Sequence, residues 1–437
     1  MIDFGKRIEL LTDDYLVDET ENASMVLNRP VLRGKVLAFD APWENPGSLG
    51  MTAYEDDGKV VLCYRGYPGP GSKDTSPEQT ACIATSDDGL TFTRPVIGTV
   101  EREGSRENNI LRMDQFCHNF GVFPDTNPNA KPEEKYKAIA GHYSLNGLYV
   151  FGSPDGINWH QLVEGPVITE GRFDSMNVAF WDKNAGVYRC YSRFLENGIR
   201  AIQSCTSEDF LHWTSPVPNV YPEAMNSNEH LYTNAANVIP GAEHMLISIP
   251  MRYHGGREKV TPEATAKGVS DCVLMTSRDG VHWSRRFREA WIAPGLNVHE
   301  WTHRNFIALS GIIERGDDFY LYLMQNYMWD DDGIFCYSLP RYRFASVYAG
   351  YGGGSFTTKP LHFLTDTFYM NYSTAAYGDV QVTVLDEDGS VLGETGKIYG
   401  NELSRPLTFD GIAGKTGRLR FALRDAHVYA LGGKMTK

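Results

Sequence analysis

The stretch that decides the fold is Ser153-Pro154-Asp155-Gly156-Ile157-Asn158-Trp159, because the same seven-residue pattern recurs along the chain. The other copies occupy residues 86–92, 207–213 and 277–283. Ser and Asp side chains accept hydrogen bonds from backbone amides two residues further on, Gly tolerates a positive φ, and the aromatic residue closes the turn. Each copy follows a short apolar run, so each predicts a hairpin: a strand, a tight turn and a second strand.

The spacing of the four copies indicates a repeated unit. They lie about 54 to 70 residues apart, which is roughly the length of one four-stranded propeller blade with its loops. Such turns belong to the outer rim of a blade, so we expect them to be architectural rather than catalytic. Five units fill the chain to about residue 350, at residues 47–95, 117–164, 175–216, 231–286 and 304–347.

The pattern changes after residue 350. The turn motif is absent there, and short strands alternate with turns such as Asp386-Glu387-Asp388-Gly389. The sequence therefore predicts an all-β protein, with a five-bladed β-propeller at residues 1–349 and a small C-terminal β-sandwich at residues 350–437. The extended segment at residues 8–17 is expected to form an entry strand. The one at residues 31–39 is expected to lead into the first blade.

Composition narrows the class of protein. A chain of 437 residues that is 42% hydrophobic and 22% charged has the balance of a soluble globular protein. Its net charge of -14 argues against a nucleic-acid partner. The sequence contains no run of eighteen apolar residues, so no membrane span is expected. The N-terminus lacks a secretory pattern, so a cytoplasmic location is expected. The seven cysteines form no CxxC pair and are expected to be buried free thiols.

Several segments resemble known enzymes. The repeated turns, followed by Leu385-Asp386-Glu387-Asp388-Gly389 and residues 419–426, are similar to glycoside hydrolase family 32 and its five-bladed relatives, including families 43, 62, 68, 117 and 130. Residues 11–17 and 357–361 look closer to a poorly characterised bacterial family-32-like branch. The invertase-type signatures Trp-Met-Asn-Asp-Pro-Asn-Gly, Arg-Asp-Pro and Glu-Cys are not in the sequence. The resemblance therefore does not extend to typical sucrose or fructan chemistry.

The resemblance implies where the chemistry lies. In a propeller, the first strand of each blade lines a central funnel, and ligands bind at its mouth. Glycoside hydrolysis usually needs two carboxyl groups flanking the scissile bond, one protonated and one ionised. Acids just before the first strands are therefore the catalytic candidates, namely Asp174, Glu229, Glu44 and Asp114.

These four acids have different expected roles. Asp174 stands where the resembled families place an essential Asp, and it would act as nucleophile, base or pKa-tuning carboxylate. Glu229 stands where the relatives commonly present a Glu and would be the general acid, with Glu223 as the alternative. Glu44 or Asp114, each in a polar loop before a blade, would supply the remaining carboxylate.

The same loops offer side chains suited to binding a sugar. Thr302 stands where an Asp follows Trp301 in the family-32-like branch, which leaves His303, Arg304 or Glu300 to contact the substrate. A His acid has a parallel in the anhydro-sugar hydrolases of family 117. The substrate-binding candidates are Trp43, Asp40, His118, Asn119, Asn177, Tyr232, Glu300, Trp301, His303 and Arg304.

The leading hypothesis is an exo-acting glycoside hydrolase that acts on a small carbohydrate without a cofactor. One alternative is a phosphorylase of family-130 type, for which Arg304 with Arg252 hints at a basic cluster. Another is a non-catalytic carbohydrate-binding propeller. Arg252 or Arg257, in an inserted loop, could bind an acidic sugar or phosphate. No ligand spacing indicates a metal site, and the sequence leaves open whether copies form a homo-oligomer.

Overall fold

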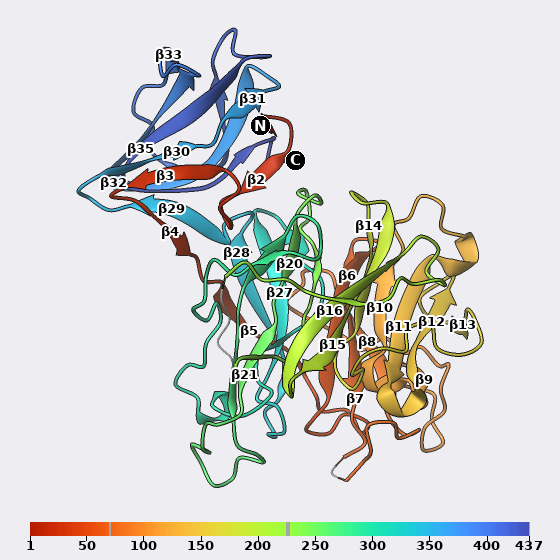
Figure 1. Ribbon diagram of the computed structural model, residues 1–437. Coiled ribbons are helices and arrows are strands. Elements are labelled where there is room, and N and C mark those ends of the chain that lie inside the picture. Colours follow the sequence, from red (N-terminus) through yellow and green to blue (C-terminus); the bar gives the residue numbers. More distant parts are fainter. Residues whose placement is uncertain (70, 224–227, 437) are drawn as a thin grey trace. The chain divides into compact units, whose positions relative to one another are not determined.

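The computed structural model describes residues 1–69, 71–223 and 228–436, and in these residues the protein is all β (Figure 1). The prediction of an all-β chain is confirmed. The helices of this part are four 3-10 turns, η1 (Cys117–Asn119), η2 (Pro132–Glu134), η3 (Tyr143–Leu145) and η4 (Val298–Glu300). The residues form two compact units, and each is described by itself.

The larger unit comprises Val31–Arg315 and Tyr320–Ser338. Its first three antiparallel sheets each contain four strands that follow one another along the chain. The first is β6 (Leu49–Asp56), β7 (Lys59–Gly66), β8 (Thr80–Ser86) and β9 (Ile110–Met113). The second is β10 (Gly121–Pro124), β11 (Tyr136–His142), β12 (Gly147–Ser153) and β13 (His160–Gln161). The third is β14 (Val178–Asp182), β15 (Val187–Glu196), β16 (Ile199–Ser207) and β17 (Val217–Pro218).

The remaining sheets of this unit depart from that regular order. The fourth four-stranded sheet is β19 (Asn237–Val238), β20 (Leu246–Ser248), β23 (Met275–Ser277) and β24 (Trp283–Ser284). It is interrupted in sequence by a separate sheet of β18 (His230–Leu231), β21 (Met251–His254) and β22 (Val269–Cys272). The fifth contains β25 (Ile307–Ala308), β27 (Asp318–Gln325), β28 (Gly333–Pro340) and β5 (Val31–Ala38), with β26 (Ile313–Arg315) paired to β27.

Strand β5 lies in the last sheet and not in the first. Its residues pair antiparallel with β28, from Gly333 opposite Ala38 to Ser338 opposite Val31. The expectation that residues 31–39 lead into the first blade is therefore corrected. The hydrogen bonds of β5 are made with a strand about 300 residues away, a pairing that no local pattern in the sequence reveals.

The first strands of the five sheets converge on common cavities. A cavity of ≈ 350 Å³ is lined by residues of β6, β10, β14 and β19 together with residues 310–314 of the fifth sheet. Backbone hydrogen bonds between Ala53 and Ser310 and between Ser310 and Met51 join the first sheet to the fifth. Residues from the first strands of several sheets are therefore brought together around the same cavity.

The predicted turns are confirmed at the level of single hydrogen bonds. Each motif begins with the Ser that ends the third strand of one of the first four sheets. In the second sheet, the Gly156 amide donates to Ser153 Oγ (2.9 Å), and the Ile157 and Asn158 amides donate to Asp155 Oδ1 (2.9 and 2.8 Å). The indole of Trp159 donates to the Gly156 carbonyl (2.9 Å). Asp155 thus satisfies two amides that the tight turn would otherwise leave unpaired.

The Gly of the fourth turn is required by its surroundings as well as by its φ of +84°. A Cβ at Gly280 would lie 2.1 Å from Nη1 of Arg189 and 2.8 Å from the Tyr191 hydroxyl. Gly186, in a hairpin of the neighbouring third sheet, has φ +68° but nothing within 4 Å of a Cβ. We therefore expect Gly280→Ala to lower the free energy of unfolding by about 3 kcal/mol and Gly186→Ala by only about 1 kcal/mol. Equal losses in chemical denaturation would contradict the steric argument.

The smaller unit comprises Met1–Pro30, Gly316–Phe319 and Leu339–Lys437. Its eleven-stranded sheet is dominated by β32 (Thr367–Asp386) and β35 (Thr416–Gly432), which pair with each other along most of their length. The other strands are β1 (Ile2–Phe4), β2 (Ile8–Leu10), β3 (Val17–Glu21), β4 (Ser24–Leu27), β29 (Ala345–Ala349), β30 (Gly354–Thr358), β31 (Leu361–Phe363), β33 (Val391–Glu394) and β34 (Asn401–Thr408).

The expected boundary at residues 349/350 stays a prediction about domains. The compact units differ from it because the first 30 residues pack with the C-terminal part of the chain. Phe4, Leu11 and Leu16 are buried in one core with Phe363 and Phe421. Burial of these large apolar side chains, each contributing roughly 1.5–3 kcal/mol, holds the N-terminal segment in this unit.

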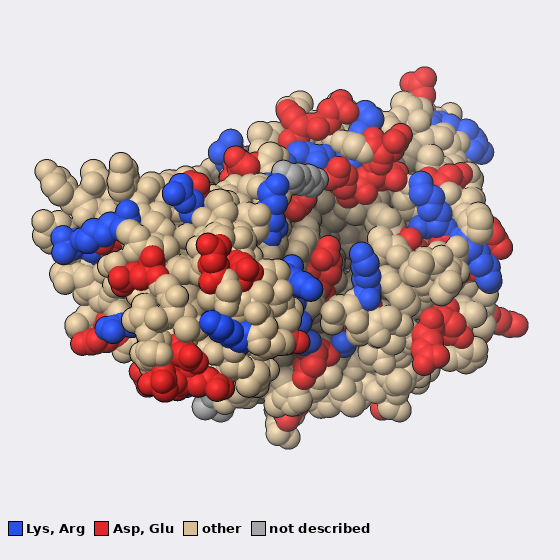
Figure 2. Space-filling view, turned by 90° about the horizontal axis from the view of Figure 1, so that it is seen from above, with Lys and Arg blue, Asp and Glu red and all other residues tan. Residues whose placement is uncertain are grey.

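Charged side chains are mixed on the surface. In Figure 2, acidic and basic side chains are interspersed over the face shown. Exposed pairs such as Lys59–Asp87 (2.9 Å) illustrate this local compensation. Such pairs are solvent-screened and contribute little to stability.

Candidate functional site

A central cavity of ≈ 280 Å³ collects side chains from strands and loops spread along the larger unit, from Leu49 to Met328. Most of them come from segments at or just before the first strands, where the sequence analysis placed its candidate residues. The polar and aromatic lining residues are Arg65, Tyr67, Asp74, His118, Asp174, Ser175, Tyr232, Thr233, Thr265, His303, Arg304 and Tyr327. Five of the predicted site residues are therefore brought together here, namely Asp174, His118, Tyr232, His303 and Arg304.

Asp174 is a partly buried carboxylate held by an arginine. Oδ1 accepts a hydrogen bond from Nη2 of Arg193, whose side chain is only 6% exposed. Burial by itself would raise the pKa of Asp174, but the Arg193 guanidinium outweighs this effect and lowers the pKa below its ordinary value. Asp174 is therefore ionised at neutral pH. Arg193 also lies over the ring of Tyr232, 4.9 Å from its centre.

Asn119 and Asn177 fix the backbone around Asp174. The Asn119 amide donates to the carbonyls of Phe173 (2.6 Å) and Ser175 (3.1 Å), and the Asn177 amide donates to the same two carbonyls (both 3.0 Å). Both asparagines are 1% exposed and lie outside the cavity lining. They position the carboxylate through the main chain rather than contact a ligand.

Asp74 is a second carboxylate in the cavity, which the sequence analysis missed. Its Oδ2 lies 3.7 Å from Nε2 of His142, and contact with this imidazole lowers the pKa of Asp74 to about 2. Nδ1 of His142 accepts from the Ser144 amide (3.2 Å), so Nε2 is the ring nitrogen that faces Asp74. Asp74 follows the second strand of its sheet, so it was not among the acids that stand just before a first strand.

His118 lies deep in the cavity wall beside a cation. Its Nδ1 is 2.9 Å from Nη1 of Arg65, whose Nη2 donates to the Gly47 carbonyl (2.7 Å). Burial, followed by the charge of Arg65, lowers the pKa of His118 to about 3. His118 is therefore neutral and accepts a hydrogen bond from the guanidinium.

His303 and Arg304 face the cavity from the loop before β25. His303 is 7% exposed, and its Nδ1 is buried without a hydrogen-bond partner among the described residues. Burial, followed by the charge of Arg304, lowers the pKa of His303 to about 4. Arg304 adopts a φ of +61°, and its Nη1 donates to the Tyr327 hydroxyl (3.2 Å). A non-glycine residue in this strained region often marks a functional position.

The neutral imidazole of His303 predicts how stability depends on pH. In the unfolded chain His303 takes up a proton near pH 6.5, whereas in the folded protein it does so only near pH 4. Between these values the unfolded state binds more protons, so the free energy of unfolding is expected to fall as the pH is lowered from about 6.5 to about 4. Chemical denaturation across this pH range should show that the free energy of unfolding falls less in His303→Gln than in the wild type. An unchanged loss in the variant would contradict this contribution.

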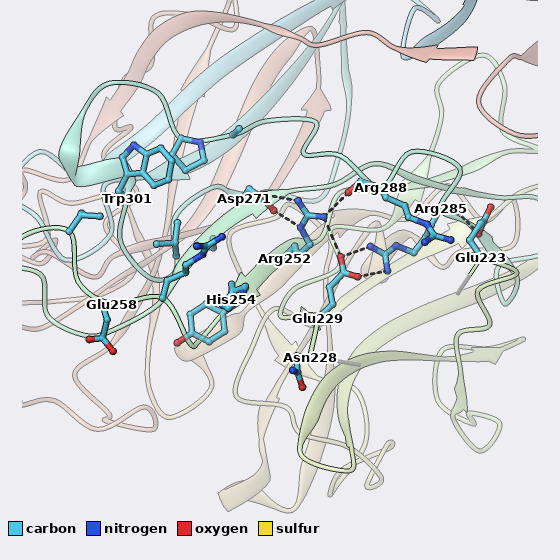
Figure 3. A pocket seen from close by; sticks show the side chains of 17 residues that line it. Glu223, Asn228, Glu229, Arg252, His254, Glu258, Asp271, Arg285, Arg288 and Trp301 are labelled. Atoms are coloured by element: carbon cyan, nitrogen blue, oxygen red, sulfur yellow. Dashed lines mark hydrogen bonds and ion pairs between the residues drawn. The ribbon is translucent and has the colours of Figure 1, made fainter. Parts of the chain in front are cut away.

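Glu229 lies in a different cavity, of ≈ 770 Å³, which Trp301 also lines. Figure 3 shows Glu229 pointing between Arg285 and Arg252, with Arg252 also directed at Asp271. Oε1 of Glu229 accepts from Arg285 Nη2 (2.6 Å) and from Arg252 Nη1 (3.3 Å). Burial would raise the pKa of Glu229, but Arg285 and Arg252 lower it below its ordinary value. An ionised carboxylate between two guanidinium groups holds no proton to donate.

Glu44 is part of a buried network outside both cavities. Its Oε1 accepts from the Tyr64 hydroxyl (2.6 Å) and its Oε2 from Arg94 Nη2 (2.6 Å). Asp40 is an exposed partner of the same Arg94 (2.9 Å). Trp43 of this loop donates to Asn109 Oδ1 (3.1 Å). The polar loop before the first blade therefore forms a structural network at this point.

The remaining predicted residues also lie outside the central cavity. Asp114 is paired with Arg112, from Oδ2 to Nε at 2.9 Å, and accepts from the Phe116 amide (2.9 Å). Glu300 accepts from the Gly295 amide (2.6 Å), and Trp301 donates to the Gly295 carbonyl (2.8 Å). In the part of the chain that the structure describes, no group of three or more His, Cys, Asp or Glu side chains is arranged to hold a metal ion.

Comparisons with known proteins give only distant likenesses. No family model matches the chain, and no curated protein matches it. Solved structures that superpose on it include one described as a glycoside hydrolase (13% identity, 71% of this chain and 92% of the other, TM-score 0.46). A beta-1,2-mannobiose phosphorylase from Listeria innocua superposes over 71% of this chain and 97% of its own (13% identity, TM-score 0.43). These likenesses are too distant to assign an activity. None of the helices in the described ranges has the length and apolar character needed to cross a membrane.

Proposed function

We propose that the protein is an exo-acting glycoside hydrolase whose active site is the central cavity. The observation that carries this proposal is the meeting of two carboxylates, Asp174 and Asp74, with the unpartnered Nδ1 of His303 in one small cavity. Paired carboxyl groups are what glycoside hydrolysis needs, and the buried ring nitrogen offers a partner for a sugar hydroxyl. The tyrosine rings of the lining provide surfaces on which a sugar ring can pack.

The proposed architecture is a five-bladed β-propeller with an appended β-sandwich. The five sheets would be the blades, closed by the pairing of β5 with β28. Support comes from the cavities, whose linings take residues from all five sheets. In the smaller unit, the apolar residues buried between the long strands β32 and β35 and the N-terminal strands support a sandwich core.

Asp174 is assigned the role of base or nucleophile. Its carboxylate is ionised because Arg193 favours the charged form, and its backbone is fixed by Asn119 and Asn177. A carboxylate held in one orientation can attack the anomeric carbon or remove a proton from water without first reorganising. The arginine also limits the nucleophile to the unprotonated form over the physiological pH range.

The proton donor is assigned to Asp74, the second carboxyl group of the cavity. Neither carboxyl group retains a proton at neutral pH, so Asp74 must first take up a proton from water. The protonated Asp74 is then a carboxylic acid at the cavity wall, where it can protonate the leaving oxygen. Glu229, the acid expected from the sequence, is replaced in this role because it lies in the other cavity.

Exo action is supported by the size of the cavity. Its ≈ 280 Å³ is near the lower end of the range for small-molecule sites, which begins at about 300 Å³. A space of this size accommodates a terminal sugar and not an internal stretch of polymer.

The proposal is tested by release of reducing sugar from a panel of aryl glycosides and plant and algal oligosaccharides. We expect turnover of at least one substrate without phosphate. Turnover that requires phosphate would replace the hydrolase by a phosphorylase. Binding of sugars by calorimetry without any turnover would replace it by a carbohydrate-binding protein. No binding and no turnover across the panel would remove the central cavity as a carbohydrate site.

A further inference from the structure

The central cavity has an unequal distribution of paired and unpaired charges. Its charged lining residues are Asp74, Asp174, Arg65 and Arg304. Asp174 is paired with Arg193, which lies outside the lining, whereas Asp74 lies 3.7 Å from His142 and interacts with Arg65 and Arg304 only over a longer distance. Within the described residues, neither Arg65 nor Arg304 lies within 4.0 Å of a carboxylate oxygen. Two cations therefore face the cavity without a direct anionic partner.

Arg65 is held entirely by uncharged acceptors. Its side chain contacts Nδ1 of His118 (2.9 Å), the Gly47 carbonyl (2.7 Å) and the His118 carbonyl (3.3 Å). The residue is 4% exposed, so it has lost nearly all its hydration. A desolvated cation is stabilised best by an anion, and neutral acceptors compensate only part of the loss.

Arg304 is likewise held by an uncharged acceptor. Its only hydrogen-bond partner among the described residues is the Tyr327 hydroxyl (3.2 Å), and its guanidinium lies 5.5 Å from the centre of the same ring. The positive φ of +61° shows that the backbone is strained where this side chain enters the cavity. The fork of a guanidinium matches a planar carboxylate or a tetrahedral oxyanion.

The second cavity provides a contrast. Arg285 binds Glu229 (2.6 Å), and Arg252 binds Asp271 (2.6 Å) and Glu229 (3.3 Å). Buried arginines elsewhere in this unit, such as Arg189 with Asp182 (2.6 Å), follow the same rule. Arg65 and Arg304 thus differ from Arg285 and Arg252 of the second cavity, each of which contacts a carboxylate.

We infer that the central cavity binds an anionic group between Arg304 and Arg65, supplied by the carboxylate or sulfate of an acidic sugar. This inference rests on the proposed function and names its substrate class. The anion forms ion pairs with the guanidinium groups of Arg304 and Arg65. Nδ1 of His303 remains available for a hydrogen bond with a hydroxyl of the same sugar. Inorganic phosphate has the same recognition chemistry and is the other source of such an anion.

The test is calorimetric titration of the protein with matched ligands. The acidic probes are D-galacturonate, D-glucuronate, galactose 6-sulfate and inorganic phosphate, and the neutral probes are D-galactose and D-glucose. We expect at least one acidic sugar to bind about 30-fold or more tightly than its neutral counterpart. Binding of phosphate but of no acidic sugar would assign the site to free phosphate. Equal affinities for acidic and neutral sugars, or no binding of any anion, would overturn the inference.

Two substitutions of Arg304 test whether this residue is responsible for the preference for an anionic ligand. Arg304→Gln is expected to remove the preference for the anion, and Arg304→Lys, which keeps the charge but not the fork, to retain part of it. Arg288→Gln, an exposed residue of the second cavity, is the matched control and should bind as the wild type does. An undiminished preference in Arg304→Gln would contradict the assignment.

Binding and turnover separate this inference from the proposed function. The titrations are repeated with Asp174→Asn, because ligand binding can be measured in this variant even if it is catalytically inactive. Anion binding without turnover of any glycoside would leave the inference standing and remove the hydrolase. Turnover of neutral glycosides without preference for acidic ones would leave the hydrolase standing and remove the inference.

Discussion

Asp174→Asn is expected to lower kcat/KM by about 1,000-fold or more while the protein stays folded. The amide keeps an oxygen that can accept the hydrogen bond from Arg193, so the geometry of the loop is preserved. What is lost is the negative charge that attacks the anomeric carbon or activates water, and removing such a group typically costs about 100- to 10,000-fold in rate. Steady-state kinetics on the substrate found in the panel, with circular dichroism to confirm folding, measures this effect.

The matched control for this variant is Asp155→Asn. Asp155 lies in the turn of the second sheet and binds two amides, which an Asn oxygen can also do. Its activity should be within about twofold of the wild type because surface substitutions of this kind rarely disturb a distant site. An Asp174→Asn variant that retains wild-type kcat/KM would exclude Asp174 as base or nucleophile.

Glu44→Gln is expected to lower the free energy of unfolding by about 3 kcal/mol. Its carboxylate is fully buried and accepts hydrogen bonds from Tyr64, from Arg94 and from the Ala41 amide. A Gln side chain has one acceptor oxygen in place of two, and its NH2 group would face donors. Breaking a buried ion pair from one side typically costs about 3–5 kcal/mol because the partner charge remains buried. Chemical denaturation gives the value directly.

Asp40→Asn is the control for Glu44→Gln because it removes a charge from the same arginine. The Asp40 side chain is 72% exposed, and its contact with Arg94 is screened by water. The expected loss is below about 1 kcal/mol. Losses of similar size in the two variants would show that burial does not govern this network, contrary to the structural argument.

These two acids show why the sequence located the site only in part. Asp174 and Glu44 both stand in loops before first strands, and both were candidates on that ground. Asp174 faces the cavity beside Arg193, whereas Glu44 is turned inward onto Arg94 and Tyr64. Asp74 was overlooked because it reaches the cavity from a loop between the second and third strands of its sheet. The position of a loop within its sheet predicts which loops lie near the cavity but not which side chains line it.

The larger fold was predictable where its signals are local. The Ser-x-Asp turns were recognised because their hydrogen bonds join residues two or three positions apart, as between Asp155 and the Ile157 and Asn158 amides. The pairing of β5 with the last sheet was not recognised from the sequence, because the partners of its residues lie about 300 residues away. The same reason accounts for the packing of Phe4 and Leu11 into the core of the C-terminal unit.

The sequence by itself determined the all-β character and the four turns, and it predicted several of the loops that line the central cavity, since each depends on residues close together in the chain. Only the tertiary structure decided the chemistry of the acids. Asp174 meets an arginine 19 residues away, Glu44 one 50 residues away and Glu229 one 56 residues away. A carboxylate's pKa and accessibility depend on which cation reaches it and on how much water remains, and both are set when distant strands pack.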